Sequence, residues 1–372
     1  MLTRLKVQGF KTLIDFDAPL SKVTVLVGPN NAGKSNILKA LGYLSDVARA
    51  GSIAADSAAG GVEELTTRGR RQSPSFLIEA ELAGSKYTYE FCPNGPWSGG
   101  QPKESLTVHG KRLIQCWWTP QGSQLQVNGV AERPPGASTP GELLNAVGRW
   151  GSTEEVTAFH SFLSGMIIAD LSADSIREPS EIVPLPTLHP SGRGLAAVLD
   201  GLQSKPLMRA AIDEAIRQAI PSVSAVVTLP DDKPGYKVVG VAEGNTAYRA
   251  RHVSDGVLLF IAITTVSQMS GGKTVIALEE PDKGIHPRRI VDIIDQVNRI
   301  ANQGTQFLIT THSPVLLNAF RDFPESVLIV DRGDRGTVAK RLSDMPNIEE
   351  QLRDVQLGDL WYSGVLGGVP TP

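Results

Sequence analysis

The sequence predicts an α/β fold in which parallel strands carry ligand-binding residues at their carboxyl ends. Residues 23–27 (VTVLV) form a continuous apolar run of strand length, and residues 36–47 place apolar side chains at helical spacing. The glycine-bearing turn 28–35 lies between them, so a strand, a tight turn and a helix follow one another. A second apolar strand, 274–278 (TVIAL), ends directly in two acidic residues, where ligands bind in open α/β sheets.

The turn after the first strand has the composition of a phosphate-binding loop. It reads GPNNAGKS and matches the pattern G-x-x-x-x-G-K-[ST] at every defined position. Its glycines let backbone N–H groups surround a β-phosphate, and the helix N-terminus adds a positive dipole end. Lys34 supplies charge to the β- and γ-phosphates, and Ser35 supplies a hydroxyl ligand for Mg²⁺. The residues predicted to bind ATP here are Gly28, Pro29, Asn30, Asn31, Ala32, Gly33, Lys34, Ser35 and Asn36.

Two segments of the second half carry the side chains that would complete a hydrolytic site. Glu279 follows the apolar strand and is predicted to hold Mg²⁺, directly or through water. Glu280 is predicted to orient and polarise the water that attacks the γ-phosphate. A further strand, 306–310, leads to His312, which we expect to hydrogen-bond the γ-phosphate or the attacking water.

Ser254, Asp255 and Gly256 open another apolar helix shortly before the acidic strand. Their hydroxyl and backbone N–H groups would form an anion site at the helix N-terminus. A plain helix cap explains the same three residues. Their position before the acidic strand favours the anion site.

The bulk composition is that of a globular protein. The 372 residues are 41% hydrophobic and 20% charged, and the net charge of −3 gives no basic signature for nucleic acid. Cys92 and Cys116 fit no metal spacing and suggest a reducing compartment. The longest apolar run, 257–266, is too short to span a bilayer, and no signal peptide is evident. We therefore expect a cytoplasmic protein without a membrane partner.

Four segments and their order resemble the ATP-binding-cassette (ABC) type of ATPase, in the branch of SMC-like heads and OLD-like predicted AAA-family ATPases. In chain order they are GPNNAGKSN, VSDGVLLF, VIALEEPDKGIHP and FLITTHSP. The resemblance covers roughly 1–80 and 220–345. It implies a P-loop NTPase fold of the ABC-ATPase head type: a mixed sheet with an antiparallel β subdomain, plus an inserted α+β or helical region.

The same resemblance implies individual roles. The phosphate loop 28–35 takes the Walker A position, Glu279 is the Walker B acid, Glu280 the catalytic glutamate and His312 the switch histidine. Residues 254–256, hereafter the signature segment, take the place of the signature motif. Residues 283–286 fall where the family's D-loop crosses a dimer interface, and Gln72 is a candidate for the lid-loop glutamine.

Departures from the transporter pattern favour the OLD-like branch. The signature reads SDG rather than SGG followed by Gln, and the acidic pair is Glu-Glu rather than Asp-Glu. OLD nucleases carry a Toprim domain after the ATPase. The stretch after His312 is too short to hold one, so we expect none here.

Pattern and composition also predict the organisation of the chain. Residues 2–20 read as a two-stranded meander, 76–91 as a hairpin, 49–63 as a flexible loop and 153–171 as a helix. The expected parts are 1–91 and 221–345 (the two parts of the ATPase core), 92–220 (an inserted region) and 346–372 (a tail that is packed or faces a partner).

Several side chains admit two interpretations. Phe10 and Lys11 could carry an adenine, although such a Phe is more often core. Asp331 and Asp334 suggest a metal site, but a turn into the next strand is favoured. The cluster Arg68, Arg70 and Arg71 is either a solvated loop or a phosphate or nucleic-acid contact; Trp97, Trp117 and Trp118 are expected to pack rather than stack on bases.

The leading hypothesis is an ATPase whose active unit is a head-to-tail homodimer or a higher oligomer. ATP would join two heads and hydrolysis would release them, controlling a separate effector in a DNA-directed or anti-phage defence system. DNA or RNA remains a possible partner. The alternatives are a nucleotide-gated scaffold with little turnover, a transport ATPase subunit, and a metal-dependent nuclease using Asp331 and Asp334.

Overall fold

A computed structural model describes most of the chain as two compact units. Unit 1 comprises Met1–Met166 and Phe323–Pro372, and unit 2 comprises Ile167–Asp322. The division of the ATPase core at 91, 220 and 345 stays a prediction. The described residues are 1–69, 74–93, 104–119, 122–127, 130–132, 144, 153–183, 188–269, 274–283, 285–334 and 336–369.

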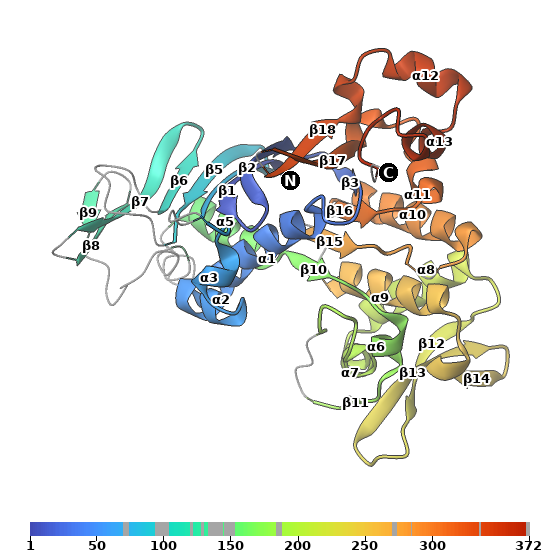
Figure 1. Ribbon diagram of the computed structural model, residues 1–372. Helices are drawn as coiled ribbons and strands as arrows, with labels where there is room; N and C mark the ends of the chain where they lie inside the picture. The colour runs from blue at the N-terminus through green and yellow to red at the C-terminus, as the bar shows by residue number, and fades with distance from the viewer. Residues whose placement is uncertain are drawn as a thin grey trace. The chain divides into compact units, whose positions relative to one another are not determined.

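The larger sheet of unit 1 is antiparallel, with eight strands in the order β2-β1-β4-β5-β6-β7-β8-β9 (Figure 1). Its tight turns place Lys11 (φ 48°), Ala83 (φ 49°) and Gly84 (φ 82°) in the left-handed region. Antiparallel pairing of β1 with β2 and of β4 with β5 confirms the meander predicted at 2–20 and the hairpin predicted at 76–91. The strands are β1 (Leu2–Phe10), β2 (Leu13–Pro19), β4 (Ser75–Leu82), β5 (Ser85–Phe91), β6 (Glu104–Val108), β7 (Lys111–Thr119), β8 (Gly122–Val127) and β9 (Val130–Glu132).

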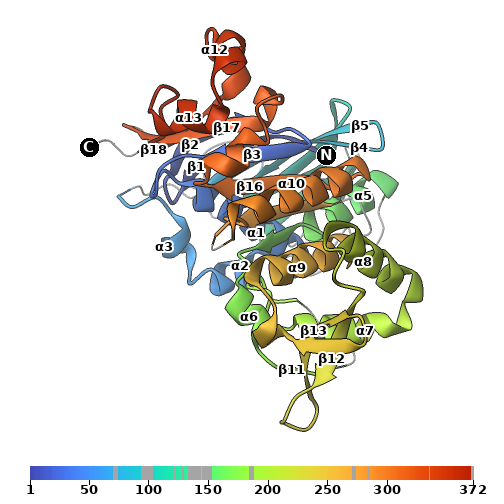
Figure 2. The same cartoon turned by 90° about the vertical axis from the view of Figure 1, so that its right-hand side faces the viewer.

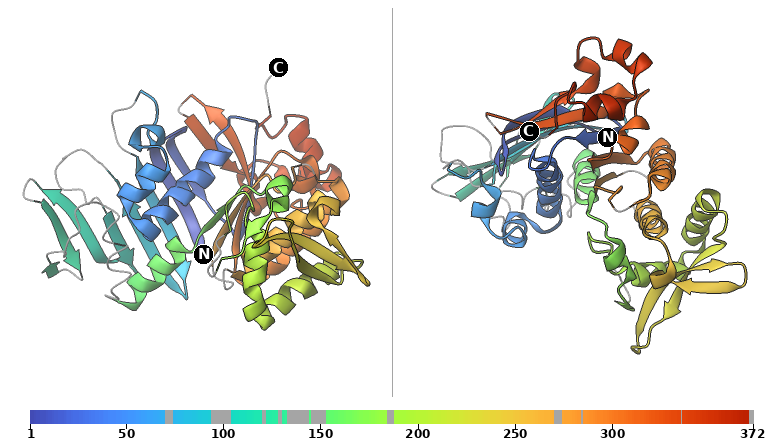
Figure 3. Two further views of the ribbon diagram at one scale, coloured as in Figure 1. Left: turned by 90° about the horizontal axis from the view of Figure 1, so that it is seen from below. Right: turned by 45° about the vertical axis from the view of Figure 1, so that its right-hand side comes forward.

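Three further strands of unit 1 lie beside the phosphate loop. β3 (Val23–Val27) pairs in parallel with β17 (Val327–Gly333), which pairs antiparallel with β18 (Gly336–Arg341). All five residues of β3 are buried, as the apolar run predicts. The helix predicted at 36–47 is α1 (Lys34–Ala50), which packs beside α5 (Glu154–Ser164) (Figure 3). The other helices are α2 (Ser52–Ala58), α3 (Val62–Leu65), α12 (Ile348–Asp354) and α13 (Leu357–Tyr362), with short 3₁₀ turns at Pro324–Ser326 and Leu342–Asp344.

Unit 2 combines a parallel group of strands with a small antiparallel sheet. β10 (Ile167–Ala169), β15 (Val275–Glu279) and β16 (Gln306–Thr311) run parallel in that order. The antiparallel sheet has the order β11-β13-β12, with β14 on β13. Its strands are β11 (Ser180–Glu181), β12 (Ala225–Pro230), β13 (Tyr236–Glu243) and β14 (Thr246–Arg249).

The helices of unit 2 pack around one nearly all-apolar helix. Residues 257–267 of α9 (Asp255–Met269) are buried, and α8 (Pro206–Ala219) and α10 (Pro287–Asn302) pack against it (Figure 2). Such a helix is apolar all round because neighbours cover every face. The remaining helices are α6 (Ala173–Arg177), α7 (Leu195–Gly201) and α11 (Pro314–Asn318), with 3₁₀ turns at Leu202–Ser204 and Ala250–His252.

Two expectations about local structure are wrong. Residues 49–63 are not a flexible loop but continue α1 and then form α2 and the start of α3. Their alanines are strong helix formers, and the glycines only separate the helices at Gly51, Gly60 and Gly61, all with positive φ. The helix expected over 153–171 ends at Ser164, and Ile167–Ala169 instead pairs with β15 as a strand.

The C-terminal segment is packed in part. Trp361 is buried, and its indole N–H donates to the Gly368 carbonyl at 3.1 Å, whereas Tyr362 is 78% exposed. Each helix in the described part of the chain is too short or too polar to span a lipid bilayer.

Phe10 belongs to the core of unit 1. Its side chain is fully buried, with ring centroids 6.2 Å from Tyr43 and 5.6 Å from Phe76. The suggestion that Phe10 carries an adenine is therefore wrong, because a fully buried ring leaves no face for a ligand.

We predict that Phe10→Ala lowers the free energy of unfolding by about 3–5 kcal/mol, because it leaves a cavity among aromatic rings. Urea denaturation of the purified protein measures this loss. Phe323→Ala, at a half-exposed phenylalanine of the same unit, is the control and should cost less than about 1 kcal/mol. A Phe10→Ala protein with unchanged stability but weakened ATP binding would contradict the core assignment.

Candidate functional site

The phosphate loop approaches neighbouring backbone too closely for side chains. A Cβ at Gly28 would lie 2.0 Å from the Val330 carbonyl oxygen of β17. A Cβ at Gly33 would lie 2.0 Å from the Thr337 hydroxyl, and Gly33 has a φ of 106°. Asn31 also adopts a left-handed conformation, with a φ of 67°. The loop therefore needs glycine at the two pattern positions for packing within unit 1.

Lys34 lies over the loop that precedes it. Its ammonium donates to the carbonyl oxygens of Gly28 at 2.7 Å and Pro29 at 3.0 Å, and the side chain is buried. Ser35 follows in the first turn of α1, whose N-terminus has no side-chain cap and no acidic residue. An uncapped helix end beside a lysine suits an anionic ligand.

Two threonines that sequence reasoning missed hold the loop in place. The Thr12 hydroxyl accepts from the Asn36 amide at 2.8 Å and lies 2.8 Å from the Thr337 hydroxyl. The backbone N–H of Thr337 donates to the Thr12 carbonyl at 2.9 Å. Neither residue belongs to a motif, so only the fold could find them.

A pocket of about 440 Å³ in unit 1 adjoins these threonines. Thr12 lines it together with polar and charged residues from three segments of the chain. The other lining residues are Lys11, Ile14, Glu63, Glu64, Thr66, Thr67, Arg68, Arg332, Gly333, Asp334 and Gly336.

In unit 2, the parallel strands bring Glu280 and His312 together. The Glu280 carboxylate Oε1 lies 2.9 Å from His312 Nε2, and each side chain is about one-third exposed. The backbone N–H of Glu280 donates to the carbonyl and the hydroxyl of Thr310, at 3.1 and 3.0 Å. Glu280 has a φ of 43°, a conformation that a non-glycine residue adopts at a cost. Glu279 is half-buried at the last position of β15.

A second link between the same strand ends was not predicted. The Thr311 hydroxyl donates to Asp282 Oδ2 at 3.0 Å and accepts from the backbone N–H of Ser313 at 2.9 Å. Asp282 Oδ1 is buried without a hydrogen-bond partner. Burial raises the pKa of Asp282 and the charge of Glu280 adds to the rise, although the Thr311 hydrogen bond opposes it. Asp282 lies in the turn after Glu280, and Thr311 directly precedes His312. Their hydrogen bond therefore connects the two segments that carry Glu280 and His312.

The signature segment opens α9 as predicted. The Leu258 N–H donates to the Ser254 carbonyl at 3.2 Å, and the Ser254 side chain is exposed. A Cβ at Gly256 would meet only ordinary contacts, 3.5 Å from Ile285 and 3.6 Å from Arg289. Packing within unit 2 therefore does not require glycine at this position.

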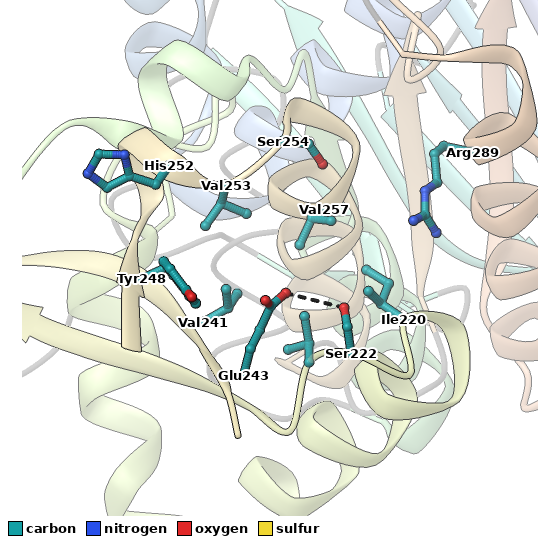
Figure 4. Close-up of a pocket in the computed structure, with 11 residues that line it drawn as sticks. Ile220, Ser222, Val241, Glu243, Tyr248, His252, Val253, Ser254, Val257 and Arg289 are labelled. Carbon is teal, nitrogen blue, oxygen red and sulfur yellow. Dashed lines mark hydrogen bonds between the residues drawn. The ribbon is translucent and has the colours of Figure 1, made fainter. Parts of the chain in front are cut away.

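A pocket of about 430 Å³ lies beside the signature segment in unit 2 (Figure 4). Ser254 and Val253 line one side, and the Ser222 hydroxyl donates to Glu243 at 3.2 Å on another. Arg289, which also lines it, pairs with Asp292 at 3.0 Å.

The other sequence-derived candidates fall in several places. Asp331 is an exposed residue of β17, Asp334 lies in the following turn, and the described residues hold no cluster of three or more potential metal ligands. That arrangement agrees with a turn. Arg70, Arg71, Gln72, Trp97, Gly284 and the side chains of Trp117 and Trp118 lie outside the described residues.

Taken with the fold, these segments define an ATPase of the P-loop class, of the ABC head type. Residues 1–84 match the family described as "AAA ATPase domain". Residues 149–318 match the one described as "AAA domain, putative AbiEii toxin, Type IV TA system". The chain is therefore an ATPase, and it is similar to the OLD-like and SMC-like members of that class.

Two curated relatives are nucleases by name. The Old nuclease of Escherichia phage P2 is 22% identical over 376 residues, covering 91% of this chain. The OLD nuclease of Thermus scotoductus is 54% identical over 41 residues, 11% of this chain and 8% of that protein. The chain spans 61% of the length of the phage protein, so activities of the whole relative do not transfer with the match.

A solved structure supports the fold. The SmcHead bound to the C-winged helix domain of ScpA superimposes with a TM-score of 0.53 at 16% identity, covering 91% of this chain and 97% of that one. The expected fold class is confirmed.

We predict that Lys34→Ala weakens ATP binding about 10- to 100-fold, because a charge-assisted contact to the phosphates is lost. Titration with a fluorescent ATP analogue measures the affinity. Lys39→Ala removes an exposed lysine from the same helix and should leave binding unchanged. Equal affinities for the two variants would exclude Lys34 from the nucleotide site.

Proposed function

We propose that this ATPase works as a head-to-tail dimer in which ATP joins two copies and hydrolysis separates them. The observation that carries the proposed hydrolysis is the contact of 2.9 Å between Glu280 and His312 at the ends of two parallel strands, with Glu280 in a strained backbone conformation. A carboxylate fixed against an imidazole is suited to orient a water and accept its proton. Strain at such a residue is typical of functional sites.

We assign the triphosphate to the phosphate loop and the metal to two oxygen donors. Lys34 would neutralise the β- and γ-phosphates, and the uncapped N-terminus of α1 would receive the phosphate oxygens. The Ser35 hydroxyl and the Glu279 carboxylate are oxygen ligands of the kind that Mg²⁺ prefers, so the donor set fits this ion. Mg²⁺ would supply charge neutralisation on the phosphates.

The nucleoside end of ATP has a candidate site beside the loop. The pocket of about 440 Å³ is within the size range of ligand sites, and Thr12 connects it to Asn36. Threonine, glutamate and arginine side chains offer hydrogen bonds to ribose and base.

The signature segment is proposed to act on the ATP of the other copy. Ser254 is exposed at the N-terminus of α9, and packing within unit 2 does not explain Gly256. A helix N-terminus with an exposed hydroxyl and a glycine allows close approach of a phosphate from outside the unit. A γ-phosphate bound between two copies would make dimerisation depend on ATP.

We propose that ATP-dependent dimerisation of this protein controls a separate effector protein in a DNA-directed or anti-phage defence system. Two relatives are nucleases by name, and a related head structure binds a partner protein by its title. The chain is similar to these proteins, and ATP-dependent closure is the step that an effector could detect.

We predict that Glu280→Gln lowers ATP turnover roughly 100- to 1,000-fold while ATP affinity is kept, because only the acceptor of the water proton is lost. Phosphate release measures turnover, and light scattering measures the mass with and without ATP. The variant should accumulate as an ATP-dependent dimer.

Asp331→Asn, at an exposed carboxylate outside this site, is the control and should behave as wild type. Unchanged turnover in Glu280→Gln would favour the scaffold that binds ATP without hydrolysing it. If Glu280→Gln loses turnover but stays a monomer with and without ATP, the proposed dimer would be contradicted.

We further predict that two inactive variants complement each other. Lys34→Ala and Ser254→Ala would each abolish most turnover, since each removes one side of every composite site. Mixed one to one, they should recover up to about a quarter of the wild-type turnover, because half of the dimers hold one intact site. No recovery on mixing, with dimers present, would show that Ser254 acts within its own copy.

A further inference from the structure

Arg177, the last residue of α6, contacts the backbone before Ser254 and the side chain of the residue after it. Its Nε donates to the Ala250 carbonyl at 3.3 Å, and its Nη2 donates to the Val253 carbonyl at 3.1 Å. Nη2 also forms a short ion pair with Asp255. One guanidinium thus contacts the residue before Ser254 and the residue after it.

These contacts are suited to fix a segment rather than merely to cover it. The planar guanidinium presents several N–H donors in fixed directions, so its acceptors must keep one geometry. The Arg177 side chain is 25% exposed, while that of its remaining partner Asp174, at 3.1 Å, is 96% exposed. The contacts with Ala250, Val253 and Asp255 are part-buried, with the Asp255 side chain 48% exposed, whereas the Asp174 pair is a surface pair of little energetic weight.

The other side of the segment is open. Val253 and Ser254 line the pocket of about 430 Å³, and Ser254 is exposed (Figure 4). Val253 and Ala250 are themselves buried, which anchors the carbonyls that Arg177 holds. The direction of Ser254 is therefore set by the first turn of α9, where the Leu258 N–H donates to the Ser254 carbonyl, and by the contacts of Arg177 with the residues on either side.

We propose that Arg177 is a positioning residue for the signature segment, setting the direction in which Ser254 meets the ATP of a second copy. The inference rests on the proposed function of Ser254. Arg177 touches neither ATP nor the reacting atoms in this role; it acts through Ser254. Sequence reasoning missed it because Arg177 and Asp255 are 78 residues apart and Arg177 belongs to no motif.

The test compares Arg177→Ala and Arg177→Lys with Asp174→Asn in the full chain. Arg177→Ala should lower kcat about 10- to 100-fold and leave the affinity for a fluorescent ATP analogue within about 2-fold, because the phosphate loop is untouched. Arg177→Lys keeps the charge but not the planar set of N–H donors, so its kcat should lie between the values of the wild type and Arg177→Ala. Asp174→Asn should keep wild-type kcat. Circular dichroism and thermal melts check that each variant is folded.

The decisive measurement is a double-mutant cycle with Ser254→Ala. If Arg177 acts through Ser254, adding Arg177→Ala to Ser254→Ala should change kcat less than about 2-fold further. Fully multiplicative losses would assign Arg177 a general structural role and overturn the inference. Where Arg177→Ala does not fold, Arg177→Lys and Asp255→Asn take its place in the same cycle.

The two hypotheses fail differently. Wild-type kcat in Ser254→Ala would remove the proposed role of the signature segment itself. A large loss in Ser254→Ala beside wild-type kcat in Arg177→Ala would leave that role intact and exclude Arg177 from it.

Discussion

The constraint on which the structure of unit 1 depends is the close approach of backbone at Gly28 and Gly33. Neither position has room for a methyl group, because β17 and the Thr337 hydroxyl occupy that space. The same absence of side chains leaves backbone N–H groups accessible to phosphate. Packing therefore demands glycine at the same two positions that the proposed recognition of a triphosphate requires, and Thr12 and Thr337 hydrogen-bond to each other beside the loop.

In unit 2, the register of the parallel strands determines where Glu280 and His312 lie. β15 and β16 pair with Glu279 opposite Thr310, so the residues that follow both strands leave the sheet at the same edge. This register brings the Glu280 carboxylate to His312, and the Asp282–Thr311 hydrogen bond ties the two turns together. The proposed acid–imidazole pair is thus a consequence of strand pairing.

Sequence patterns predicted the parts of this arrangement that depend on near neighbours. The phosphate loop, the apolar strand before it and the helix after it are read from spacing within a few residues, and all three were found. The same approach failed at 49–63, where alanine-rich helices were taken for a loop because glycines interrupt them. It also failed over 153–171, where Ile167–Ala169 is a strand only because β15 lies beside it.

By itself, the sequence determined the class of protein, because the phosphate loop, the acidic strand end and the histidine each occupy a short, recognisable stretch. Only the tertiary structure decided that Phe10 is core, that Thr12 and Thr337 support Gly33, and that Arg177 holds the signature segment. Those contacts join residues far apart in the chain. They depend on register and packing, which local periodicity does not encode.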